Sequence, residues 1–184
     1  MKIIKTGIEG LLEIIPEVYH DKRGWFLEFY KEEPFHSHGI PYKFTQENIS
    51  FSQKGVIRGL HFQLAPWQQA KLVSVLSGKV MDVVVDLRKG SPTFGKTHTC
   101  VLDAEQHNLL MVPEGFAHGF AALEDSLFLY KSSNVYNRDF ESGIVWNDPH
   151  LNIQWPFENH MLSEKDKKLT TFHELLRKSV ISQV

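Results

Sequence analysis

The sequence predicts a single all-β domain, a sandwich or barrel, spanning residues 1–184. Its 184 residues suit one domain with a substantial core. Apolar residues make up 42% and charged residues 23%, as in folded globular domains. Short apolar or alternating runs recur between Gly, Pro, Asn and Asp, which is typical of strands and turns. These runs are Leu11–Ile15, Val56–Phe62, Lys71–Leu76, Val80–Leu87, Thr97–Leu102, Asn108–Val112 and Ser126–Tyr130.

The segment Lys71–Leu87 predicts a β-hairpin. Ser77-Gly78 is a turn signal between two runs rich in β-branched residues. In the second run Asp82 and Asp86 share one strand face, while the other face carries Met81, Val83, Val85 and Leu87. Two acids on one face could line a polar cavity, or they could face solvent or bind the backbone of a turn.

The C-terminal stretch Ser163–Val180 predicts a helix. Ser163 is suited to cap its start, because three charged residues follow it directly. Apolar residues then recur near helical spacing, which predicts a helix that covers part of the barrel. They are Leu169, Phe172, Leu175 and Leu176, followed by Ser179 in the same spacing. The preceding Trp146–Pro156 is expected to be an ordered loop.

Charge and composition argue against several classes of partner. The net charge is −2 and the isoelectric point is near 6.5, so nucleic acid and acidic membranes are not expected partners. No run is long and apolar enough to span a bilayer, and charged residues interrupt the N-terminal run. Cys100 is the single cysteine, which excludes an intramolecular disulfide. A cytoplasmic protein is therefore expected.

Two histidines lie in glycine-containing strand segments. His61 follows Gly59-Leu60, and His118 precedes Gly119. A glycine beside a strand histidine lets another backbone or a ligand approach closely. Taken alone, either ring is better explained as a structural residue held by a hydrogen bond than as a catalyst. A metal site is not expected at these two, because Gln63 stands where a second histidine would be needed and no suitable glutamate follows.

Other side chains suit acid–base chemistry. Lys71 is either a solvated strand-end lysine or a cation that stabilises an oxyanion. Tyr130 is either a core residue or a proton donor. Tyr136 lies on a more polar segment, where an aromatic ring could stack on a nucleobase. The sequence contains no glycine-rich phosphate loop, no dinucleotide fingerprint and no Gly-x-Ser-x-Gly motif, so nicotinamide chemistry and nucleophilic hydrolysis are not expected.

The ordered set of motifs resembles the dTDP-4-dehydrorhamnose 3,5-epimerases. The resemblance runs from about Asp21 to Asp166, nearly the whole domain. It is carried by Asp21–Glu28, Gln46–Ser50, Gly55–Gln63, Gln69–Val73, Asp82–Arg88, Pro113–Phe120, Leu129–Lys131, Tyr136, Gly143–Asp148, Trp155-Pro156 and Leu162–Asp166.

This resemblance implies a cupin-like jelly-roll barrel and a dTDP-4-keto-6-deoxyhexose substrate. It implies epimerisation of carbons 3 and 5 without a cofactor, in dTDP-L-rhamnose biosynthesis for a bacterial surface polysaccharide. His61 is then the base, Asp166 orients it, Lys71 stabilises the enolate and Tyr130 is the acid. Substrate contacts are implied at Arg58, Gln46, Asn48, His118, Tyr136 and Glu141, with Lys165 a further candidate. A homodimer with exchanged N-terminal strands would place Arg23, Phe26 and Glu28 in the partner's site.

Three alternatives stay open at this level. The protein could epimerise only carbon 3 or only carbon 5, or act on a related nucleotide-linked 4-keto sugar. It could be a sugar-nucleotide binding module without activity, although a binder has no need of an acid–base pair. A metal-dependent cupin is the third alternative.

Overall fold

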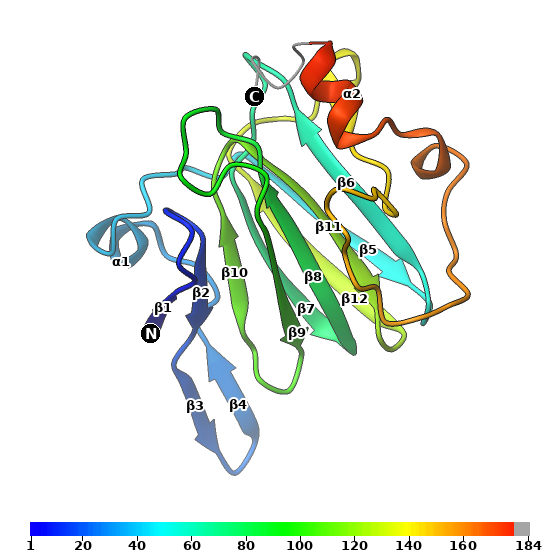
Figure 1. Cartoon of the computed structure of the whole chain (residues 1–184). Coiled ribbons are helices and arrows are strands. Elements are labelled where there is room, and N and C mark those ends of the chain that lie inside the picture. The colour runs from blue at the N-terminus through cyan, green and yellow to red at the C-terminus, as the bar shows by residue number, and fades with distance from the viewer. Residues whose placement is uncertain (179–184) are drawn as a thin grey trace.

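A computed structural model describes residues 1–178 and shows two antiparallel β-sheets packed face to face (Figure 1). The six-stranded sheet has the order β1 (Lys2–Lys5), β2 (Leu12–Ile15), β10 (Leu109–Val112), β7 (Lys71–Ser77), β12 (Ser126–Ser132), β5 (Gln46–Ser52). The five-stranded sheet has the order β13 (Glu141–Gly143), β6 (Ile57–Gln63), β11 (Phe116–Ala122), β8 (Lys79–Asp86), β9 (Thr97–Asp103). The hairpin of β3 (Val18–Asp21) and β4 (Gly24–Leu27) projects from one end. The prediction of an all-β jelly roll is confirmed.

The main core lies between the two sheets. Strand alternation points Phe128 of β12 inward, where it is 1% exposed and stacks on Phe120 of β11 at 4.2 Å between ring centroids. Burying such a side chain contributes about 1.5–3 kcal/mol. Smaller clusters cover the outer faces. The helix α2 (Phe172–Arg177) packs on the five-stranded sheet, and Phe35 of the helix α1 (Glu32–Ser37) packs on the six-stranded sheet.

The predicted hairpin Lys71–Leu87 is wrong, because its two strands enter different sheets. β7 pairs with β10 and β12, whereas β8 pairs with β11 and β9. The turn itself is present, with Gly78 at φ +75°, and a Cβ there would lie 2.3 Å from the Asp125 carbonyl oxygen. The turn therefore crosses from one sheet to the other.

The two acids of β8 are both fully buried, so neither faces solvent. Asp86 binds the turn that follows, because its Oδ1 accepts the Arg88 backbone N–H at 3.0 Å and its Oδ2 accepts the Thr93 hydroxyl at 2.7 Å. Asp82 instead accepts a hydrogen bond from His118, as described below.

The predicted C-terminal helix is wrong in its start. Ser163 precedes only a 3-10 turn, η2 (Asp166–Lys168), whose N-cap is Lys165, and the Ser163 hydroxyl oxygen accepts the Asp166 N–H at 3.0 Å. Leu169 is extended, and α2 begins after Thr171, which forms a capping box with Glu174. Ser179 and Val180 lie outside the described residues.

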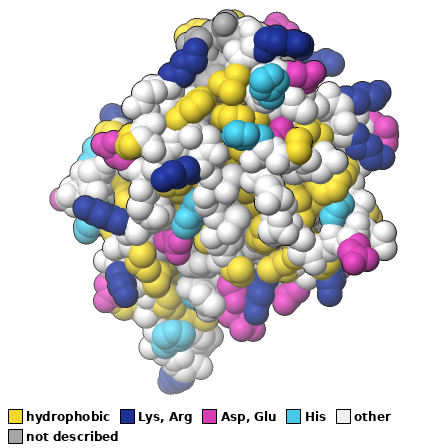
Figure 2. Space-filling model, viewed as in Figure 1, with side chains coloured by type: hydrophobic (Ala, Val, Ile, Leu, Met, Phe, Trp, Pro, Cys, Tyr) yellow, Lys and Arg dark blue, Asp and Glu magenta, His cyan; other side chains and the backbone are white. Residues whose placement is uncertain are grey.

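The remaining peripheral elements are short. The segment Trp146–Pro156 contains no helix or strand, and the Trp155 indole donates to the Trp146 carbonyl oxygen at 2.7 Å, so it is the ordered loop expected. A second 3-10 turn is η1 (Arg138–Phe140). None of the helices within residues 1–178 has the length and apolar composition needed to cross a bilayer. Basic and acidic side chains are interspersed over the face seen in Figure 2.

Candidate functional site

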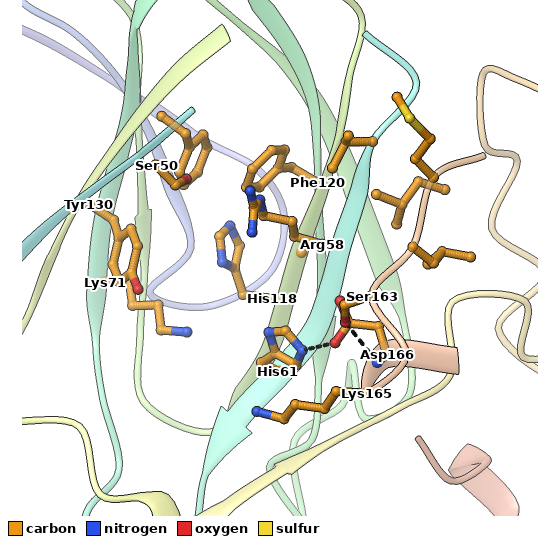
Figure 3. Close-up of a pocket in the computed structure, with 16 residues that line it drawn as sticks. Ser50, Arg58, His61, Lys71, His118, Phe120, Tyr130, Ser163, Lys165 and Asp166 are labelled. Carbon is orange, nitrogen blue, oxygen red and sulfur yellow. Dashed lines mark hydrogen bonds and ion pairs between the residues drawn. The ribbon is translucent and has the colours of Figure 1, made fainter. Parts of the chain in front are cut away.

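A cavity of about 540 Å³ lies between the sheets (Figure 3). This volume is in the range of small-ligand sites. Both sheets and the C-terminal segment contribute polar side chains, so residues far apart in sequence meet here. They are Arg58 and His61 of β6, His118 of β11, Lys71 of β7, Tyr130 of β12, and Ser163, Lys165 and Asp166.

The cavity contains a histidine–aspartate pair. His61 Nε2 lies 2.7 Å from Asp166 Oδ1, and the Asp166 side chain is 5% exposed. Burial acts to raise the pKa of the Asp166 carboxyl, but hydrogen bonds from His61, the Gly59 N–H and Ser163, with the charge of His61, outweigh it and hold the pKa below its ordinary value. The carboxylate is therefore ionised and fixes the proton on Nε2, which leaves Nδ1 as the acceptor atom of the ring.

Close backbone approach brings the two histidines side by side. A Cβ on Gly59 would lie 2.6 Å from Gly119 Cα, so only glycine allows β6 and β11 to meet at this point. His118 pairs directly with His61 across these strands. Its Nε2 lies 2.9 Å from Asp82 Oδ2. Two histidines of one sheet therefore line the cavity, and each is paired with a carboxylate, Asp166 of η2 for His61 and Asp82 of β8 for His118.

Lys71 and Tyr130 enter the cavity from the other sheet (Figure 3). Burial lowers the pKa of Lys71 to about 8, although the charges of Asp82 and Glu141 act against this. Burial raises the pKa of Tyr130, again with a contribution from Glu141. The Lys71 ammonium lies 5.9 Å from the centroid of the Tyr130 ring. At neutral pH this wall presents a cation beside a protonated phenol.

A smaller cavity of about 280 Å³ shares Tyr130 with the first one. It is lined by Gln46 and Asn48 of β5, and by Tyr136, whose backbone N–H donates to Gln46 Oε1 at 2.8 Å. Glu141 contacts one residue of each cavity. It accepts a hydrogen bond from the Tyr136 hydroxyl at 2.6 Å and forms an ion pair with Lys165.

Arg58 lies at the mouth of the larger cavity. It donates to Ser52 Oγ at 2.9 Å and to the Phe51 carbonyl oxygen at 3.0 Å. These contacts hold the guanidinium group above the cavity (Figure 3).

Three predicted residues are not brought to this site within the chain. Arg23, Phe26 and Glu28 lie on or beside the projecting β3–β4 hairpin, where Phe26 is 66% exposed and Arg23 pairs with Asp21 at 2.5 Å. Sequence reasoning missed the role of Asp82, which it placed on a polar strand face without a partner. It also missed that Ser163 lines the cavity, where its hydroxyl oxygen accepts the Asp166 N–H.

Comparison with known proteins identifies the family. The sequence model described as dTDP-4-dehydrorhamnose 3,5-epimerase matches residues 5–174. The chain belongs to the dTDP-4-dehydrorhamnose 3,5-epimerase family. It is an epimerase built on the cupin-like jelly roll of that family.

Individual relatives cover nearly the whole epimerase. The dTDP-4-dehydrorhamnose 3,5-epimerase of Shigella flexneri is 48% identical over 90% of this chain and 93% of its own. A Legionella pneumophila 3,5-epimerase solved with dTDP-4-keto-L-rhamnose has a TM-score of 0.92 at 42% identity, covering 97% of this chain and 96% of its own. A dTDP-4-dehydrorhamnose 3-epimerase of Streptomyces niveus is 43% identical over 91% of this chain and 82% of its own. Overall identity therefore does not separate one-carbon from two-carbon epimerases.

Proposed function

We propose that this epimerase inverts carbons 3 and 5 of dTDP-4-dehydro-6-deoxy-D-glucose, in dTDP-L-rhamnose biosynthesis and without a cofactor. One observation carries the assignment. A histidine–carboxylate pair stands on one wall of the cavity, and a lysine beside a protonated tyrosine stands on the other. A sugar ring held between these walls presents opposite faces to the base and to the acid.

In the proposed reaction His61 Nδ1 removes the proton from a carbon next to the ketone. The C–H electron pair forms a C=C bond, and the ketone oxygen becomes an enolate that the Lys71 ammonium stabilises. The Tyr130 hydroxyl then donates its proton to the opposite face of that carbon, the ketone re-forms and the centre is inverted. Solvent returns a proton to Tyr130 and takes one from His61. Asp166 acts through His61, which it orients and stabilises when protonated.

The nucleotide is proposed to lie over the smaller cavity. Two buried polar groups there have no partner within the described residues, the Asn48 amide nitrogen and the Ser132 hydroxyl. Buried polar groups without partners are costly, so a ligand that binds them gains affinity. Tyr136 is proposed to stack on the base and Arg58 to bind the diphosphate. His118, Gln46, Glu141 and Lys165 complete the proposed contacts.

Deuterium incorporation tests the reaction. The protein is incubated with dTDP-4-keto-6-deoxyglucose in D₂O and carbons 3 and 5 are followed by NMR. Deuterium should enter both carbons with inversion. His61→Ala should abolish entry, while Tyr130→Phe should allow entry with retention, because the base can return deuterium to the same face. His173→Asn, exposed on α2, is the matched control.

The same experiment separates the alternatives. Deuterium at carbon 3 alone identifies a one-carbon epimerase, which the similarity to the Streptomyces niveus 3-epimerase keeps as the second candidate. Absence of deuterium at both carbons, with the nucleotide still bound, identifies a binding module and refutes the proposal.

We also propose a homodimer with exchanged N-terminal strands. Apolar side chains stand exposed on the outer face of the six-stranded sheet and on β4, and such faces mark interfaces. They include Ile49, Phe51 and Leu76 at 50–58%, and Trp25 and Phe26 at 57% and 66%.

Arg23, Phe26 and Glu28 would then enter the partner's cavity. Sedimentation should give twice the chain mass, and Phe51→Glu should give monomers, while a monomeric wild-type protein would contradict the dimer. A cytoplasmic location stays a prediction.

A further inference from the structure

A second group of ligand-forming side chains lies outside the catalytic cavity. It consists of Glu13 on β2 with His98 and Cys100 on β9, and their ligand atoms all lie within 4.8 Å of one another. Among residues 1–178 this is the one group of three such side chains with that spacing. None of the three lines the cavity that holds His61.

The three side chains connect strands of different sheets. β2 belongs to the six-stranded sheet, whereas β9 is the edge of the five-stranded sheet. His98 and Cys100 alternate with exposed threonines on β9, so both point into the sandwich, where Cys100 packs against the main core. His98 and Glu13 are 19% and 29% exposed, with His98 Nε2 at 3.1 Å from Glu13 Oε1.

We propose that Glu13, His98 and Cys100 bind one zinc-type divalent transition-metal ion that clips β2 to β9. Imidazole nitrogen, thiolate sulfur and carboxylate oxygen are the zinc ligands of proteins. At ordinary zinc bond lengths, tetrahedral nitrogen and oxygen ligands lie about 3.3 Å apart and sulfur about 3.5 Å from each. The His98–Glu13 separation of 3.1 Å already fits this geometry. The sulfur lies within 4.8 Å of the other two ligand atoms, so it needs a shift of at most about 1.3 Å.

An entry path and a fourth ligand are available. A crevice of about 330 Å³ is lined by Glu13, Ile15, Gln106 and Asn108, so an ion and its water can reach the carboxylate from solvent. Three protein ligands with one water complete four-coordination.

The negative charge around Cys100 favours binding of a cation. The carboxylates of Glu13 and Asp82 both place negative charge near Cys100. The same two carboxylates attract a divalent ion, which would displace the thiol proton on binding. Since the ion binds only the folded arrangement, it would stabilise the sandwich.

Cobalt binding to metal-free full-length protein tests the site. Cys100 is the single cysteine of the chain, so any thiolate-to-cobalt charge-transfer band reports this residue. One equivalent of Co²⁺ should produce the band, Zn²⁺ should displace it, and Cys100→Ser should abolish it. Removing a residue that only hydrogen-bonds to a metal ligand weakens metal binding by about 10- to 100-fold. His98 and Glu13 are themselves proposed ligands, so His98→Asn and Glu13→Gln should weaken Co²⁺ binding at least about tenfold.

A control variant and two measurements on the wild-type chain accompany the cobalt experiment. His173→Asn, which removes an exposed histidine on α2, should bind Co²⁺ like the wild type. In the wild-type chain, Zn²⁺ should raise the melting temperature and protect Cys100 from a thiol reagent, a readout that needs no variant. Absence of the band at saturating Co²⁺ overturns the proposal, as does Zn²⁺ binding of equal strength in Cys100→Ser and His98→Asn.

Discussion

Lys71 should give the epimerase an alkaline limit near pH 8. Its pKa is lowered to about 8, because the amine is taken out of water between the sheets. The proposed enolate needs the protonated amine, so activity should fall as pH rises through this value. The protonated fraction drops about tenfold from pH 7 to pH 9 and about tenfold again to pH 10, and kcat/KM should follow it.

The assay is deuterium entry into substrate at pH 6–10, corrected for exchange without enzyme. Lys71→Arg supplies the control, because a guanidinium stays charged over this range. In that variant activity should no longer fall as the pH rises through 8, even if its overall rate is lower. Tyr130 does not produce this fall in activity, since burial raises its pKa above the ordinary value of a phenol. A wild-type profile that stays flat to pH 10, or a fall in activity that persists in Lys71→Arg, would refute the reasoning.

Three further predictions follow from the geometry. Asp166→Asn removes a charge-assisted hydrogen bond worth about 1.5–3 kcal/mol, so kcat should fall roughly 10- to 150-fold, and a rate near wild type would contradict the pairing with His61. Asp86 has its pKa lowered to about 2 from 3.8, as hydrogen bonds from Arg88 and its loop outweigh burial. Because the pKa is lower in the folded protein, the ionised carboxylate stabilises the fold above about pH 4, and this stabilisation is lost as pH falls through 2. Asp86→Asn should therefore lower the free energy of unfolding, measured by urea denaturation, by about 2 kcal/mol at pH 7 and by much less at pH 2. Gly78→Ala should cost at least about 2 kcal/mol in the same assay, because its backbone is left-handed and the added Cβ clashes, and an unchanged midpoint would contradict this.

Local patterns predicted the strands well and their pairing badly. The run Thr97–Leu102 became β9 with one residue added, because alternation and turn residues are local signals. Pairing is not local: the turn at Gly78 is compatible with a hairpin or with a crossing between sheets. The start of the C-terminal helix was predicted wrongly for a related reason. Leu169 continues the apolar spacing of the helix, but its backbone is extended between η2 and α2.

The candidate site was predicted through ordered motifs rather than through spacing. The cavity brings His61 and Asp166 together although 105 positions separate them, and no periodicity could have indicated this contact. The same limit hid the pairing of His118 with Asp82, which lie 36 positions apart. Arg23 was predicted by motif as well, but its place in a partner's site depends on an assembly that one chain does not contain.

His61 lies on one sheet and Tyr130 on the other, so the gap between the sheets sets the distance between the proposed base and the proposed acid. Facing sheets stand about 10 Å apart, at a distance set by the side chains between them. Phe120 and Phe128 are among these spacers, and they also line the cavity. Replacing either phenylalanine with a larger or smaller residue would therefore change the distance between the proposed acid and the proposed base. Turnover should then change although every proposed proton-transferring group is still present.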